Sequence, residues 1–179
     1  MTRVIRGRAA RGQLADAIQA AVAGEFLAPG PRLVVHAPVL TDPALLDNRQ
    51  NAYRTLLPDL GYREVRLSDV VRELLLRGAA VDIGYRVADR SAAAAEQLRR
   101  MVRREAPGAA FRMLAAPDLP GSGILLTGYF LDGDIVWEAD GIGVGPAGAA
   151  AIVGPEADEA GAAWLGYWEE HGHAATGPQ

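Results

Sequence analysis

The chain has 179 residues, of which half are hydrophobic and none is cysteine, and its formal net charge is −4 at pH 7. This length and composition fit one globular domain with a sizeable core and exclude a disordered or fibrous chain. The lack of cysteine excludes disulfides, thiolate metal sites and cysteine nucleophiles, and no apolar run approaches the ~18 residues of a transmembrane helix.

The chain begins with a helix signal followed by a strand signal. Apolar residues recur at helical spacing over Arg8–Phe26, up to the breaker Pro29-Gly30-Pro31. The N-terminal segment 1–30 is therefore expected to be helical. The valine-rich run Arg32–Leu40 then predicts a buried strand.

Two helices are predicted next. Asp42 followed by Pro43 is typical of a helix start, and this helix should end at Leu57, before a proline. Ser68 should cap a second helix, SDVVRELLLRG, which Gly78 ends.

The next segment indicates a further strand, helix and strand. Ala80–Val87 is an apolar run that predicts a strand. Ser91 should cap a helix that stops at Pro107-Gly108, and Ala110–Leu114 predicts another strand. The order β-α-α-β-α-β is typical of a mostly parallel sheet covered by helices.

The last third has a different pattern. Asp132-Gly133 predicts a tight turn between strands Ile124–Leu131 and Asp134–Glu138. Gly141–Val144 and Ala149–Val153 are candidates for further strands.

A closing helix is predicted over Pro155–Glu170. Trp164 and Trp168 are four residues apart, so they should lie on one face and dock this helix on the sheet. The polar tail from Gly172 to Gln179 is expected to fray. We therefore expect a single α/β domain over residues 1–179, with a mixed, mostly parallel sheet and helices on both faces.

Three histidines are the first candidates for chemistry. His36 lies in an apolar strand, where a histidine is usually a buried, hydrogen-bonded core residue. His171 and His173 follow two glutamates and could hold a divalent metal, but a polar chain end of this kind is usually solvated. We expect no metal site.

The densest acidic cluster is Asp132, Asp134, Glu138 and Asp140. Paired carboxylates can perform acid–base work or bind a metal. Here the turn explains Asp132, and the other three share the parity of one solvated strand face. A structural interpretation is favoured.

The glycine string and the serines do not match a catalytic motif. Gly141, Gly143 and Gly145 lack the helix that must follow a phosphate-binding loop. Ser122 is not in a nucleophile-elbow context, and the other two serines are expected to be helix caps.

Charge is divided unevenly along the chain. All 18 basic residues are arginines and precede Met113, in a part of the chain that also contains 12 acidic residues. The part from Met113 onward contains 10 acidic residues and no basic one. Such asymmetry can mark self-association or a nucleic-acid face, or it can average out in the fold. The predicted helix from Ser91 presents four outward arginines: Arg99, Arg100, Arg103 and Arg104.

Two stretches resemble segments of phospholipase D-like domains. Residues 71–86, VRELLLRGAAVDIGYR, resemble that superfamily's step from a helix through arginine-glycine to a strand. Residues 111–144, FRMLAAPDLPGSGILLTGYFLDGDIVWEADGIGV, resemble the segment through its H-x-K-x-x-x-x-D motif, where the motif strand ends in an Asp-Gly hairpin turn. The similarity in segment order spans Arg32 to Glu170.

The motif itself is degenerate. With its aspartate on Asp132, its histidine falls on Leu125 and its lysine on Thr127. In the superfamily the histidine forms a covalent phospho-intermediate and the lysine binds phosphate, and leucine can do neither. The resemblance therefore implies a non-catalytic copy, similar to those attached to helix-turn-helix transcription regulators, which sense ligands or dimerise. Active members pair two units, so the resemblance also implies a homodimer.

We therefore expect a cytoplasmic, non-catalytic regulatory module without catalytic residues, metal or cofactor, since the basic N-terminus lacks the apolar segment of a secretory signal. Its partners would be a small ligand, a second copy or a regulatory protein, and neither a membrane nor nucleic acid is expected. The expected ligand-binding residues are His36, Tyr85, Thr127 and Asp132.

Two alternatives stay open. The first is a phosphodiesterase or other hydrolase that uses His36 with Asp132, Asp134 and Asp140. The second is a nucleic-acid or protein interaction module that uses the arginine-rich half of the chain.

Overall fold

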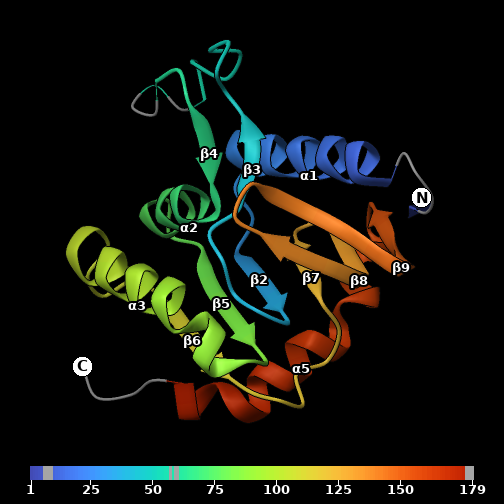
Figure 1. Cartoon of the computed structure of the whole chain (residues 1–179). Helices are drawn as coiled ribbons and strands as arrows, with labels where there is room; N and C mark the ends of the chain where they lie inside the picture. The colour runs from blue at the N-terminus through green and yellow to red at the C-terminus, as the bar shows by residue number, and fades with distance from the viewer. Residues whose placement is uncertain (6–9, 57, 59–60, 176–179) are drawn as a thin grey trace.

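The computed structural model describes residues 1–5, 10–56, 58 and 61–175 (Figure 1). Within this part of the chain, seven strands form one sheet in the order β1-β9-β8-β7-β2-β5-β6, and two strands form a separate ribbon, β3-β4. The strands are β1 Thr2–Ile5, β2 Arg32–Ala37, β3 Ala44–Asp47, β4 Glu64–Arg66, β5 Ala80–Tyr85, β6 Phe111–Ala115, β7 Gly123–Leu126, β8 Tyr129–Glu138 and β9 Gly141–Val153. The helices are α1 Ala10–Leu27, α2 Leu67–Leu76, α3 Ala88–Glu105, α4 Glu156–Ala160, α5 Ala162–His171 and the 3₁₀ helix η1 Gly172–Ala175.

The expected α/β fold with a mixed sheet and helices on both faces is confirmed. β2, β5 and β6 are parallel, whereas the pairings among β2, β7, β8, β9 and β1 are antiparallel. Parallel pairings are therefore two of six rather than the majority. Two of the four antiparallel pairings follow from the short turns that connect β7 to β8 and β8 to β9, since only antiparallel neighbours can be joined in this way.

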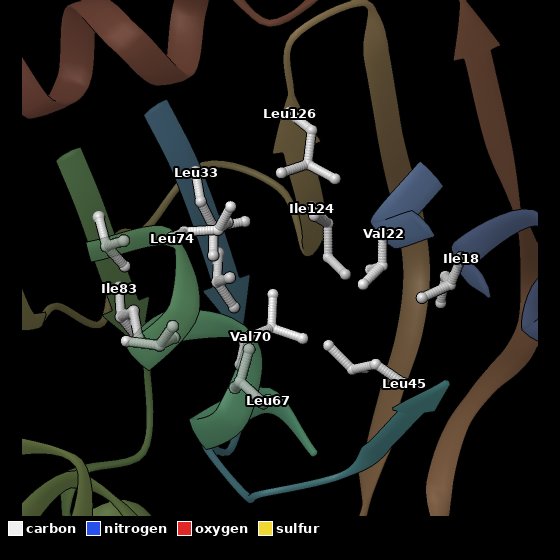
Figure 2. Packing of buried hydrophobic residues seen from close by; sticks show 14 of the residues in the cluster. Ile18, Val22, Leu33, Leu45, Leu67, Val70, Leu74, Ile83, Ile124 and Leu126 are labelled. Carbon is white, nitrogen blue, oxygen red and sulfur yellow. The ribbon is translucent and has the colours of Figure 1, made fainter. Parts of the chain in front are cut away.

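One face of the sheet carries the main core. α1, α2 and α3 cover this face and bury aliphatic side chains against it. Figure 2 shows side chains of α1, α2, β2, β3, β5 and β7 converging there; the labelled ones are Ile18, Val22, Leu33, Leu45, Leu67, Val70, Leu74, Ile83, Ile124 and Leu126.

The opposite face carries a second, smaller cluster. α4 and α5 bury Ala157, Trp164 and Trp168 against Val34, Leu125 and Phe130 of the sheet. The prediction that the two indoles dock a closing helix is confirmed, because Trp164 is 3% and Trp168 0% exposed. The helix is broken at Gly161, however, where an added Cβ would lie 2.6 Å from the Leu125 side chain.

The helix predicted from Asp42 to Leu57 is wrong. Ala44–Asp47 is strand β3, paired with β4 in a ribbon that projects at the top of Figure 1, and Leu57 lies outside the described residues. Asp42 does bind the start of a helix, but this helix is α2, which lies further along the chain. The Asp42 carboxylate accepts hydrogen bonds from the backbone N–H and the hydroxyl of Ser68, both at 2.8 Å.

The two expected serine caps are also wrong. Ser68 lies inside α2, whose N-cap is Arg66, and Asp69 receives the Arg66 N–H at 2.9 Å. Ser91 lies inside α3, whose N-cap is Val87; its hydroxyl donates to the Val87 carbonyl and accepts the Leu40 N–H. Ser68 is thus the second residue of α2 and Ser91 the fourth residue of α3, and each forms tertiary or local hydrogen bonds there instead of capping its helix.

The hairpin turn predicted at Asp132-Gly133 lies instead at Thr127-Gly128. Asp132 and Gly133 are within β8, opposite Ala150 and Ala149 of β9. An irregularity follows, because residues 145–148 of β9 have no ladder partner there, and the Asp134 carboxylate accepts the Ala147 N–H at 3.2 Å. Asp-Gly suits such a bulge as well as a turn.

The chain ends of the domain differ from expectation in two places. Thr2–Ile5, expected within a helical segment, form edge strand β1 beside β9. Gly172–Ala175, expected to fray, form η1, which contacts β6. The rest of the predicted tail, 176–179, lies outside the described residues.

Candidate functional site

The carboxyl ends of β2, β5 and β6 are where an open α/β sheet usually binds its ligand. Here residues 116–122, which follow β6, fold back over this edge. The Ala116 N–H donates to the Tyr85 carbonyl at 2.9 Å. The buried Leu119 side chain rests on Gly84, where an added Cβ would lie 2.5 Å from it. The usual ligand position is therefore filled by the chain itself.

Arg86 fastens this loop from the end of β5. Its guanidinium donates to the Leu119 carbonyl from Nε at 3.2 Å and from Nη2 at 2.9 Å. Nη2 also donates to the Gly121 carbonyl at 2.8 Å. A guanidinium has five N–H donors in a fixed fork, and Arg86 makes three hydrogen bonds to the loop.

His36, at the end of β2, is fully buried beneath α5. Its Nδ1 lies 2.6 Å from the Pro120 carbonyl, which can only accept, so Nδ1 carries the proton. Its Nε2 accepts the Trp168 indole N–H at 2.9 Å. The ring stacks on Trp164 at 3.9 Å between centroids. Both ring nitrogens are thus engaged within the protein.

This environment keeps His36 neutral. Burial lowers its pKa to about 4, and the positive charge of Arg86 acts in the same direction. If Nε2 were protonated, two N–H donors would face each other and the hydrogen bond from Trp168 would be lost. The geometry is that of a structural histidine, which agrees with the favoured interpretation of the sequence.

A second polar contact lies under α5. Asp82 of β5, 1% exposed, accepts from Arg112 of β6 at 2.6 and 2.8 Å. Arg112 also donates to the Trp168 carbonyl at 3.1 Å, and its guanidinium lies over the Trp168 ring. Arg32 is 3.6 Å from the same carboxylate. Sequence patterns gave no signal for this pair because its members are thirty residues apart.

The structure does not bring the four expected ligand-binding residues together. Tyr85 is buried in the main core, on the face opposite His36. Thr127 is exposed in the β7–β8 turn, near Gly30. Asp132 lies on the His36 face, but its carboxylate accepts the Ser122 N–H at 2.9 Å.

The acidic cluster is also spread out. Asp132 and Asp134 hold the Ser122 and Ala147 backbone, respectively, whereas Asp140 lies at the β8–β9 turn. The described residues contain no group of three His, Cys, Asp or Glu side chains that could hold a metal ion. His171 donates from Nδ1 to the Tyr167 carbonyl at 3.0 Å, and its ring stacks on the Tyr167 ring.

The corrected turn changes the comparison with the H-x-K-x-x-x-x-D motif. At the original placement, Leu125 is buried against Gly161 and can perform no chemistry. If the motif's aspartate is moved to the observed turn at Gly128, its histidine and lysine positions fall on Gly121 and Gly123. Neither placement supplies a nucleophile or a phosphate-binding cation.

A hollow of about 150 Å³ lies elsewhere, between α1, the β3–β4 ribbon and the β8–β9 turn. Its apolar lining includes Ile18 of α1, Leu45 and Leu46 of β3 and Ile142 of β9. Sequence reasoning missed this groove because the three elements are far apart in the chain and β3 was predicted to be helical.

The polar lining of this groove consists of Gln19, Asp47, Glu64 and Asp140. Arg49 donates to both oxygens of Asp47 at 3.0 and 2.7 Å and lies 3.8 Å from Glu64. These hydrogen bonds lower the pKa of Asp47 to about 2, so it is ionised. Since one carboxylate accepts up to about four hydrogen bonds, the rim still offers acceptors to a bound molecule.

Three of the four predicted outward arginines of α3, Arg100, Arg103 and Arg104, are exposed, and all three contact a glutamate. Arg100 and Arg103 lie 3.3 Å from Glu96, and Arg104 contacts Glu105. Arg99 is half-buried. Glu96 and Glu105 thus offset part of the positive charge of these arginines.

Comparison of the chain with family models, curated proteins and solved structures found no match. Of the helices in the described ranges, none combines the length and the hydropathy of a transmembrane span.

Proposed function

We propose that this chain is a non-catalytic, phospholipase D-like regulatory module that binds a small ligand without converting it. The observation that carries the proposal is the division between two places. The edge where an α/β sheet holds its catalytic groups is closed by residues 116–122, whereas the open groove lies between α1, the ribbon and the β8–β9 turn.

The groove favours a small amphipathic ligand. Its volume of about 150 Å³ is on the order of an engineered apolar cavity that holds benzene. Its aliphatic floor suits a hydrocarbon or aromatic body, and its carboxylate rim suits amine or hydroxyl donors. Since its lining belongs to three elements, a bound molecule would fix the ribbon relative to the sheet.

The non-catalytic part is tested with a generic phosphodiester, bis(p-nitrophenyl) phosphate. Hydrolysis by the purified chain should stay at the buffer background. Turnover that His36→Ala abolishes, while the variant stays folded, would contradict the proposal and favour the hydrolase alternative.

The binding part is tested with benzylamine as the probe and benzoate as its acceptor-bearing counterpart. Amide resonances of Leu46, Asp47 and Ile142 should shift with benzylamine and much less with benzoate. Ala15→Phe should fill the groove and remove the shifts, because Ala15 is an exposed residue of its lining. Ala20→Phe, exposed on α1 but outside the lining, is the matched control. Shifts that map elsewhere, or that survive Ala15→Phe, would contradict the assignment.

A further inference from the structure

The strap, residues 155–175, crosses the face of the sheet opposite α1–α3 and contains α4, α5 and η1 (Figure 1). Its buried side chains contact Val34, Leu125 and Phe130 in a cluster that is separate from the main core. The main core is therefore formed without any residue of the strap.

The contact between strap and sheet has the composition of a protein interface. Trp164, Tyr167 and Trp168 meet His36 and Arg112, and aromatic residues and arginine are enriched at the centre of interfaces. Hydrogen bonds also cross it, from Trp168 to His36, from Arg112 to the Trp168 carbonyl and from Tyr167 to Asp118. Such a surface can hold the strap whichever copy of the chain supplies it.

The strap leaves β9 through a single hinge. Gly154 has a φ of +102°, and an added Cβ there would meet no atom within 4 Å. Pro155, the N-cap of α4, follows directly. The positive φ folds the strap back onto its own sheet, and an extended Gly154 would direct it away.

We propose that the strap is exchanged between two copies of the chain, so that each sheet is covered by the strap of the other copy. Every contact between strap and sheet is then made as in the single chain, and only the hinge changes conformation. The exchanged dimer is closed and symmetric, and its formation depends on protein concentration because association costs translational and rotational freedom.

The first test uses the absence of cysteine in the chain. Leu125→Cys places a thiol on the sheet, and Gly161→Cys places one on the strap. The two positions are adjacent, since an added Cβ at Gly161 would lie 2.6 Å from the Leu125 side chain. The two full-length single variants are mixed in denaturant, refolded together at high concentration and then oxidised. Exchange should give a disulfide-linked pair of one copy of each variant. The double variant, refolded when dilute, should form the bond within one chain, which controls for geometry.

The second test changes the hinge. Alanine rarely adopts a φ near +102°, so Gly154→Ala should disfavour the folded-back strap and raise the dimer fraction on the order of ten-fold in sedimentation. Gly148→Ala, at a φ of +82° in the β9 bulge, should destabilise the chain without this rise. If the mixed variants give no linked pair and Gly154→Ala stays monomeric at high concentration, the proposal is overturned. If the chain dimerises but the Leu125→Cys and Gly161→Cys variants form no disulfide with each other, the dimer uses another surface. This result would also overturn the proposed exchange.

Discussion

The two faces of this sheet are covered in different ways. On one face, α1, α2 and α3 bury a large cluster of aliphatic side chains. On the other, α4 and α5 bury two indoles over a histidine and an arginine–aspartate pair. The first face is held by apolar area, whereas the second is held by a smaller area and a connected set of hydrogen bonds.

This difference predicts two responses to mutation. Loss of apolar area is graded, since each removed group costs its transfer free energy and the cavity it leaves. Loss of a buried hydrogen bond is abrupt. When one partner is removed, the other stays buried without a hydrogen bond, and no water is there to supply one. The α5 face should therefore tolerate removal of both partners of a pair better than removal of one.

The largest expected effect is that of Trp168→Ala. Trp168 is 0% exposed, and truncation of a buried tryptophan costs ~3–5 kcal/mol. The same change leaves His36 Nε2 without a donor, which places the cost at the upper end of this range. Chemical unfolding monitored by circular dichroism should show a strongly lowered midpoint.

Trp168→Phe separates the two contributions. It keeps most of the ring and removes the indole N–H, so its cost should be about 1–3 kcal/mol, mainly from the unpaired His36 nitrogen. Unfolding free energies of Trp168→Ala and Trp168→Phe that are equal within error would mean that ring area contributes nothing here.

The next effect concerns Asp82 and Arg112. Asp82→Leu should cost about 3 kcal/mol, because it leaves Arg112 partly buried without its carboxylate. The double variant Asp82→Leu/Arg112→Met should recover most of this loss, since replacing both members of a buried ion pair by apolar residues is often neutral. A double-mutant cycle of unfolding free energies measures the difference. Additive losses would show that the two faces respond alike.

A third effect is the pH dependence set by His36. Its pKa is about 4 in the folded chain, against an ordinary 6.5. Above 6.5 the histidine is neutral in both states, and the stability is fully present. Between these two values the unfolded chain binds a proton that the folded chain does not, so stability falls as pH falls, by ~3 kcal/mol in all.

His36→Gln tests this dependence. Glutamine can accept from Trp168 but does not titrate, so the variant should lose less stability than the parent chain between neutral pH and about pH 4. The comparison of the two proteins at each pH cancels the carboxylates that they share. Parallel pH profiles of unfolding free energy would mean that another group sets the dependence.

Sequence patterns predicted the main helices and the central strands, but neither strand β3 of the main core nor the polar contacts under α5. The periodicity of α1, α2 and α3 and the apolar runs of β2, β5 and β6 are local, so the chain itself encodes them. Trp164 and Trp168 were predicted from helical spacing in the same way. The contacts of Trp168 with His36 and Arg112 join residues far apart in the chain, and no local pattern specifies them.

The misplaced elements have the same cause. Asp42 carries a local helix-start signal, but it caps α2 through space, and Ala44–Asp47 pair with β4 instead. Asp132-Gly133 carries a turn signal, but the pairing of β8 with β9 extends through it. In both cases a strand partner distant in sequence decided between two conformations that the local residues allow.

The smallest expected effect lies on the outer side of α3, where neither face of the sheet is involved. Arg103 is exposed and lies 3.3 Å from Glu96, and exposed ion pairs contribute about 0–1 kcal/mol. Arg103→Ala should therefore leave the unfolding midpoint almost unchanged. Leu98→Ala, on the inner side of the same helix and 1% exposed, should cost ~2–5 kcal/mol. Equal losses would mean that α3 is held by its arginines rather than by its apolar side.

The same variant tests the nucleic-acid alternative. Glu96 and Glu105 already pair with Arg100, Arg103 and Arg104, so Arg103→Ala should leave any binding of the protein to duplex DNA at low salt unchanged. A clear loss of DNA binding would favour the nucleic-acid alternative.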